Sequence, residues 1–151
     1  MNQTSDLLIE LRKILEEFEK KSLSGDLRSR VIALVPAFEA VRKIGKSLVA
    51  DGLKKSARDR LLAYFLEYPQ TVLSERELAV VAGISEWARR VRELRVEFGW
   101  KIITGVTASQ MIKAEELGEG DIDVSDLAPN DYVLIDEEQD LESAHRWNVA
   151  N

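Results

Sequence analysis

Residues 74–104 read SERELAVVAGISEWARRVRELRVEFGWKIIT, and the order of signals in this stretch predicts the fold. Ser74 followed three residues later by Glu77 is a capping box that begins a helix, and Gly83 ends that helix. Ser85 is predicted to cap a second helix directly after the turn. Two short helices joined by so tight a turn are typical of a helix-turn-helix.

The segments on either side complete the pattern of a winged helix. They are, in chain order, a helix over residues 56–68, an extended segment at 71–73, and strands at 100–104 and 131–135. About 26 residues separate the two strands, which is long for a hairpin loop. A short helix over 107–117 and an acidic loop over 118–129 are expected in that connection, and residues 138–151 are expected to be helical.

The N-terminal region shows two further helical patterns, over residues 6–21 and 26–50. Pro36 lies inside the second pattern, which predicts either a kink or two helices that meet there. Each pattern carries one apolar stripe, and two exposed stripes are rare on soluble monomers. We therefore expect residues 1–53 to pack either on the rest of the chain or on a second copy, as a homodimer.

The predicted fold class is mainly α with a small β wing, in which an N-terminal helical unit precedes a winged helix-turn-helix. The predicted domains are an N-terminal helical region (1–55), the winged helix-turn-helix (56–136), and the start of a connecting helix to a C-terminal domain (137–151). The chain has no cysteine and no apolar run long enough to cross a membrane, which indicates a cytoplasmic protein.

The net charge of −6 is unevenly distributed along the chain. Residues 1–60 hold 13 Lys and Arg against 9 Asp and Glu, whereas residues 108–151 hold 2 against 12. Phosphate attraction acts over about 8–10 Å in physiological salt. An acidic C-terminal region that points away therefore does not exclude a DNA-binding face elsewhere.

The second helix of the helix-turn-helix is the candidate for reading base edges in the major groove. At 100° per residue, its apolar arc contains Trp87, Val91, Leu94 and Phe98, and the opposite arc contains Ser85, Arg89, Arg92 and Val96. The predicted DNA-binding residues of this helix are Ser85, Glu86, Arg89, Arg90, Arg92 and Glu93. The alternative is a solvated face with ion pairs four residues apart, such as Glu86–Arg90.

A second basic group precedes and begins the helix over residues 56–68. It consists of Lys54, Lys55, Arg58 and Arg60, which are predicted to contact DNA phosphates. Ordinary surface charge is the alternative interpretation of these four side chains.

No complete active site or metal site is evident in the sequence. His145 is the single histidine, and the acidic residues Asp121, Asp123 and Asp126 lack the glycine and glutamate of a calcium-binding loop. No carboxylate–lysine arrangement of a nuclease is present either. We expect no cofactor in this chain and no cleavage of DNA by it.

Residues 86–102, EWARRVRELRVEFGWKI, resemble the winged-helix domain found in HNH-type and related restriction endonucleases. Residues 77–83, 131–134 and 145–151 match further parts of the same pattern. The resemblance implies recognition of double-stranded DNA, with sensitivity to methylation as a further property to test. It implies an N-terminal fragment of a type II restriction endonuclease, in which divalent metal would belong only to the missing nuclease domain.

Two other classes of function stay open at this point. The chain could be a stand-alone winged-helix regulator of transcription that dimerises through residues 1–53. It could also be a winged helix that binds a protein rather than DNA.

Overall fold

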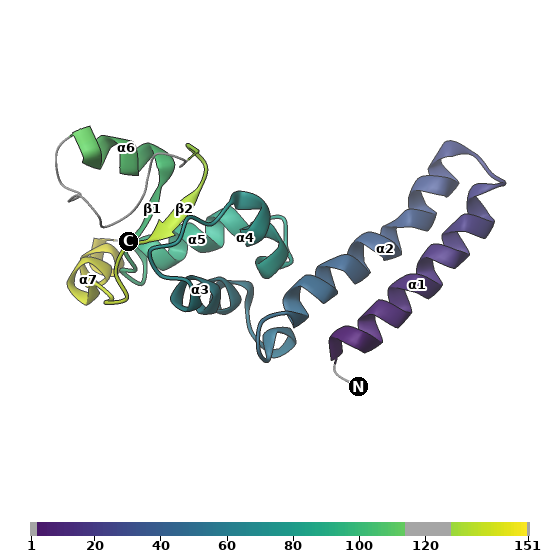
Figure 1. Ribbon diagram of the computed structural model, residues 1–151, viewed down its shortest axis with the longest axis horizontal. Coiled ribbons are helices and arrows are strands. Elements are labelled where there is room, and N and C mark those ends of the chain that lie inside the picture. The colour runs from purple at the N-terminus through teal and green to yellow at the C-terminus, as the bar shows by residue number, and fades with distance from the viewer. Residues whose placement is uncertain (1–2, 114–127, 151) are drawn as a thin grey trace.

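The computed structural model describes residues 3–113 and 128–150, and it is mainly helical with one small sheet (Figure 1). The elements are α1 (Gln3–Ser22), α2 (Leu27–Ser47), a 3₁₀ turn η1 (Gly52–Lys54), α3 (Ala57–Glu67), α4 (Glu75–Ala82), α5 (Trp87–Val96), β1 (Ile102–Thr104), α6 (Gly105–Lys113), β2 (Tyr132–Leu134) and α7 (Leu141–Ala150). The mainly helical fold class with a small β element is therefore confirmed.

Helices α1 and α2 form an antiparallel hairpin that extends away from the other elements (Figure 1). The Asp26 side chain caps α2 by accepting a hydrogen bond from the Ser29 amide at 2.8 Å. At the open end, the hydroxyl oxygens of Thr4 and Ser47 lie 2.8 Å apart. Helix α2 runs through Pro36 as one helix, so the alternative of two separate helices is wrong.

The α1–α2 hairpin meets the rest of the chain at the C-terminal end of α2. Gly45 is buried there, and a Cβ added to it would lie 2.4 Å from the carbonyl oxygen of Val80 in α4. Only glycine allows this approach of α2 to α4. The expected packing of the N-terminal region on the rest of the chain is thus present, but it covers only one end of α2.

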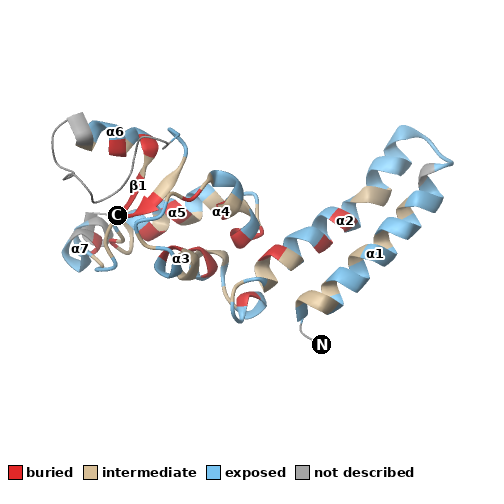
Figure 2. Ribbon diagram, viewed as in Figure 1, coloured by how far each residue is buried: buried red, intermediate tan, exposed pale blue. Residues whose placement is uncertain are grey.

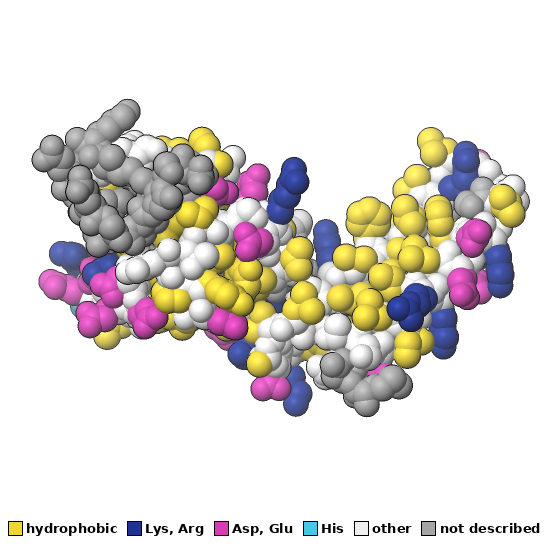
Figure 3. All heavy atoms as spheres, in the orientation of Figure 1, with side chains coloured by type: hydrophobic (Ala, Val, Ile, Leu, Met, Phe, Trp, Pro, Cys, Tyr) yellow, Lys and Arg dark blue, Asp and Glu magenta, His cyan; other side chains and the backbone are white. Residues whose placement is uncertain are grey.

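The hydrophobic core lies in the α3–β2 region, residues 57–134, where α3, α4, α5 and both strands converge (Figure 2). Its largest fully buried side chains are Leu61, Phe65, Leu73, Leu78, Leu94, Ile102 and Leu134. The α1–α2 hairpin has no comparable core, and apolar side chains are exposed along it (Figure 3).

The small sheet joins β1 and β2 in antiparallel register, with Ile103 opposite Val133. Leu73 extends this pairing through two hydrogen bonds with Tyr132, 2.8 and 2.9 Å long. Both predicted strands and the short extended segment before α4 are therefore confirmed. Successive side chains of a strand point to opposite faces of the sheet. Ile102 and Leu134 therefore join the core, whereas Ile103 and Val133 pack with Ala108 of α6 on the other face.

The capping box before α4 is also present. The Ser74 hydroxyl accepts from the Glu77 amide at 3.2 Å, and the Glu77 carboxylate accepts from the Ser74 amide at 2.7 Å. Gly83 ends α4 with a left-handed φ of 65°. These local signals act through hydrogen bonds within a few residues, which is why the sequence predicts them well.

Two expectations about element boundaries need correction. Ser85 does not cap α5, because the helix begins at Trp87 and its N-cap, Glu86, makes no side-chain capping bond. The helix in the connection begins directly after β1, at Gly105, instead of at residue 107. Most of the predicted acidic loop lies outside the described residues. Within residues 3–113 and 128–150, no helix has both the length and the apolar character needed to cross a membrane.

Candidate nucleic-acid interface

Helix α5 is fixed by its apolar arc, which lies against the core. Val91 and Leu94 are each 2% exposed. The Trp87 ring packs edge-on against Tyr132 of β2, with 5.8 Å between centroids and 84° between planes. These contacts confirm the predicted inward arc, and they leave the opposite arc of α5 at the surface.

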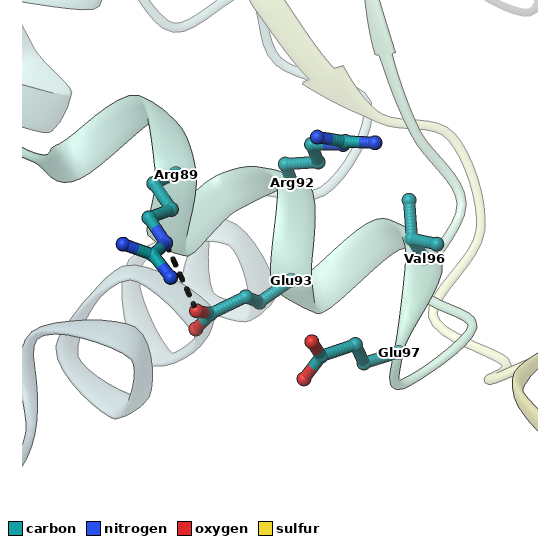
Figure 4. Close-up of a pocket in the computed structure, with 5 residues that line it drawn as sticks. All are labelled: Arg89, Arg92, Glu93, Val96 and Glu97. Carbon is teal, nitrogen blue, oxygen red and sulfur yellow. Dashed lines mark ion pairs between the residues drawn. The ribbon is translucent and has the colours of Figure 1, made fainter. Parts of the chain in front are cut away.

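That outward arc presents arginines around a shallow hollow. The Arg89 side chain is 70% exposed and Arg92 is also exposed. The hollow has a volume of about 190 Å³ and is lined by Arg89, Arg92, Glu93, Val96 and Glu97 (Figure 4). In this view Arg89 bends towards Glu93, whereas Arg92 extends to the other side of the helix. The surface therefore combines cations with a carboxylate beneath them.

Glu93 holds three arginines at the base of this surface. Its carboxylate lies 3.0 Å from Arg90, 3.4 Å from Arg58 and 4.0 Å from Arg89, and its side chain is only 15% exposed. An ion pair that is partly withdrawn from water is screened less by salt than a fully exposed one. Glu93 is thus a partner that fixes arginine side chains, with little surface of its own.

Arg58 comes from α3 and lies beside α5. Its guanidinium carbon is 4.6 Å from the centre of the Phe98 ring, and it pairs with Glu93. A cation above an aromatic face is attracted by the ring quadrupole. The structure thus brings Arg58 next to α5, as part of the same charged surface.

Arg90 is more enclosed than a typical surface arginine. It pairs with Glu93 on one side and with Glu86 at 3.9 Å on the other, and its side chain is 27% exposed. The Glu86–Arg90 pair is the solvated alternative considered for this face. Among the described residues, the Arg90 Nε is buried without an acceptor.

Arg60 was expected to contact DNA phosphate, and its burial contradicts that expectation. It is 4% exposed, and its guanidinium donates to four backbone carbonyls: those of Gly52 (3.1 Å), Lys55, Val81 (3.1 Å) and Ala82 (2.5 Å). Burial lowers the pKa of Arg60 from its ordinary value. Arg60 therefore connects η1 to the end of α4 and offers no surface for phosphate.

The remaining predicted residues are at the surface. Lys54 is exposed at the end of η1, and Lys55 after it is half-buried. Ser85 and Glu86 are exposed in the turn before α5. Sequence reasoning missed Glu97 as part of the hollow and the central place of Glu93. The four-residue spacing from Arg89 to Glu93 was the available signal for the second of these.

Residues that could bind a metal do not gather in the described part of the chain. No group of three or more His, Asp or Glu side chains with suitable geometry occurs in residues 3–113 and 128–150. His145 is exposed on α7. Asp121, Asp123 and Asp126, which were considered as a calcium loop, lie outside the described residues.

Taken together, the fold and this surface define a small α-rich domain that displays an arginine-bearing helix on a packed core. The family model described as the KpnI N-terminal domain matches residues 58–135, which is more than half of the chain. The chain therefore belongs to the KpnI N-terminal domain family, and it is related to the N-terminal region of KpnI-like restriction enzymes. Comparisons with curated proteins and with solved structures gave no match.

The match begins at Arg58 and ends at Ile135, so it coincides with the α3–β2 region. It includes the core, α5 and the Arg58–Glu93 contact, and it leaves out α1 and α2. The expected relation to restriction enzymes is thus supported for this region. The α1–α2 hairpin is an addition that the family model does not describe.

Proposed function

We propose that this protein binds double-stranded DNA through the outward face of α5, as the recognition domain of a restriction system. The observation that carries the proposal is the exposure of Arg89 and Arg92 on a helix whose other face is fixed in the core. Arginine can make two parallel hydrogen bonds to guanine O6 and N7, or to phosphate. The family relation supplies independent support.

The arrangement of elements around α5 supports a winged-helix mode of binding. Helix α4, the Gly83 turn and α5 follow the order of a helix-turn-helix, and the antiparallel pair of β1 and β2 would form the wing. In that mode the second helix of the pair enters the major groove. The outward residues of α5 would then face base edges, and Arg58 and Lys54 would lie towards the backbone.

Glu93 fits this proposal as a positioning residue. It pairs with Arg58, Arg89 and Arg90, and so restricts the conformations of these long side chains before DNA arrives. Holding a flexible side chain near its binding conformation reduces the entropy lost on association. Phosphates can attract the same arginines, so Arg89, which has the longest pairing distance, is the most readily released.

The decisive test is selection of preferred sites from random duplex pools, methylated and unmethylated, followed by titration of the best site. Arg89→Ala and Arg92→Ala should each weaken binding by about 1–3 kcal/mol, which is about 5- to 150-fold in Kd. Arg28→Ala, an exposed arginine on α2, is the matched control and should bind like the wild type. Unchanged affinity in the Arg89→Ala/Arg92→Ala double variant would overturn the proposal.

A salt titration separates base reading from phosphate attraction. Lys54→Ala should reduce the slope of log Kd against log salt by about one unit while the preferred sequence stays the same. A wild-type protein that shows no salt-dependent duplex binding would instead assign the α5 face to a protein partner.

A further inference from the structure

Helix α2 carries an apolar stripe that the described residues, 3–113 and 128–150, leave uncovered. The stripe consists of Leu27, Val31, Val35, Phe38 and Val41, which are 71%, 56%, 46%, 66% and 54% exposed. Their spacings of three and four residues place them on one side of the helix. All five positions of the stripe, from Leu27 to Val41, are apolar. Figure 3 shows hydrophobic side chains gathered over this part of the molecule.

Helix α1 extends the same face. Leu8 and Leu15 are 39% and 45% exposed and lie two helical turns apart. Glu10 and Lys13 of α1 line a groove with Pro36 of α2, which marks one flank of the α1–α2 hairpin. At 100° per residue, Leu8 and Leu15 lie on the opposite flank, beside the α2 stripe. The apolar face therefore spans both helices of the hairpin.

The size of this face exceeds what a monomer usually exposes. These seven side chains, each about half exposed, present roughly 500–700 Å² of apolar surface. The largest apolar patch of a typical monomer is about 300–600 Å², and stable interfaces bury about 800 Å² per partner. With a polar rim added, the face is large enough for a stable complex.

The face is also continuous with a contact that the chain already makes. Four residues beyond Val41, Gly45 continues the stripe and packs against Val80 of α4. The chain thus uses this side of α2 for packing where α4 reaches it. In the part of the chain that the structure describes, the remaining turns of the same stripe have no partner.

We propose that a second copy of this chain covers the apolar face, so that two α1–α2 hairpins form an antiparallel four-helix bundle. A two-fold axis lets the same stripe bury itself on both copies. Charge favours a particular pairing of helices. Helix α2 has five basic residues and one acidic residue, whereas α1 has five acidic and four basic. The α2 helix of one copy therefore lies closest to α1 of the other, where opposite charges flank the apolar stripe.

Sedimentation equilibrium of the full chain without DNA tests this proposal independently of DNA binding. The wild type should be a dimer at micromolar concentration. Phe38→Glu and Val31→Glu, which place a charge within the stripe, should each raise the dimer Kd at least tenfold. Leu23→Glu is the matched control, because Leu23 is 88% exposed in the loop between α1 and α2, outside the stripe. It should dimerise like the wild type.

Circular dichroism and Trp fluorescence should show that each variant keeps its helices and its core, since all three positions are exposed. A wild-type chain that stays monomeric at about 100 µM, far above the micromolar range of weak specific complexes, would overturn the proposal. A dimer that survives both stripe substitutions would overturn it as well, because the contact would then lie elsewhere. DNA binding by a monomeric wild type would leave the proposed function intact while removing the dimer.

Discussion

Phe65 and Phe38 show how differently the two regions of this protein are built. Phe65 is fully buried between α3 and its neighbours in the α3–β2 region, whereas Phe38 is 66% exposed on the α1–α2 hairpin. Both occupy the apolar stripe of an amphipathic helix. The pattern alone thus specifies which face is apolar, and only the surrounding elements decide whether that face is covered.

The two regions also differ in how their contacts are distributed. In the α3–β2 region, α3, α4 and α5 join both strands and an extended segment around the main core, and the family match falls on this region. The hairpin consists of two helices that pack mainly on each other, with small residues such as Ala37 and Ala40 at the buried positions. Helices packed through alanine bury little apolar area, so the hairpin alone is expected to be the less stable region.

The largest expected effect is the difference in the free energy of unfolding between substitutions at Phe65 and at Phe38. Phe65→Ala should lower the free energy of unfolding by about 3–5 kcal/mol, because it leaves a cavity in the core. Phe38→Ala should change it by no more than about 0.5 kcal/mol in a monomeric sample at high dilution. Trp fluorescence in urea reports the α3–β2 region together with α7, since Trp87 and Trp100 pack on the core, Trp147 lies on α7, and the hairpin has no tryptophan.

Far-UV circular dichroism on the same urea series includes the helices of the hairpin. If the two regions differ as described, loss of helix should begin at a lower urea concentration than the change in fluorescence. Coincident transitions, with an equal effect of both substitutions, would contradict the contrast between the regions.

A smaller effect on the free energy of unfolding is expected at Arg60, which links the base of the hairpin to the α3–β2 region. Arg60→Lys keeps the charge but replaces a planar fork of donors by one ammonium group, so several of its carbonyl acceptors lose their partner. The free energy of unfolding should fall by about 2–4 kcal/mol. Arg58→Lys is the matched control two residues earlier, on a side chain that is 34% exposed, and it should cost less than about 1 kcal/mol. An equal cost at both positions would show that burial of Arg60 contributes nothing to stability.

The smallest expected effect is a decrease in the free energy of unfolding at low pH, caused by protonation of Glu77. Burial opposes ionisation of this carboxyl, but hydrogen bonds from the Ser74 amide and from Tyr64 and Ser74 side chains outweigh it, so the pKa of Glu77 is lowered. Its folded pKa is below the unfolded value of about 4.3, so its contribution is present above that pH and is lost as pH falls through the folded pKa. Glu77→Gln should flatten the decrease in fluorescence-detected stability over this range.

Glu75→Gln, an exposed carboxylate in the same turn of α4, provides the matched change of charge. The same decrease in both variants would mean that the capping box gives no special dependence on acid.

On the alkaline side, burial and the hydrogen bond to Glu77 raise the pKa of Tyr64 to about 12. Stability from the neutral Tyr64 is thus present below about pH 10 and decreases as the pH rises towards 12.

Much of the α3–β2 region could be predicted because its signals are local. The Ser74–Glu77 capping box, the Gly83 turn and the isoleucine-rich strand around Ile103 depend on contacts within a few residues or on residue types that favour strands. The inward and outward arcs of α5 followed from the same periodicity. Ser85 was assigned as a cap because its residue type suits that place, but the chain turns once more before α5 begins.

Residues that depend on distant segments could not be predicted in this way. Arg60 looks like a surface cation in the sequence, and its four acceptors come from η1 and from the end of α4. It does fall on the arc of α3 that contains Ala57 and Tyr64, beside Leu61, which was a signal of burial. The meeting of Arg58 with Glu93 likewise depends on how α3 packs on α5, which periodicity does not specify.

The position of Arg60 also affects the local opening of the folded chain, in which backbone amides become exposed to water. One buried guanidinium donates to carbonyl groups of η1 and of the last turn of α4, so the departure of either segment leaves some of its donors without acceptors. Amide hydrogens at the base of the hairpin and at the end of α4 should therefore exchange with a common opening free energy, although they are far apart in the sequence. The junction between the hairpin and the α3–β2 region would then behave as one cooperative unit, while the distant loop of the hairpin exchanges freely.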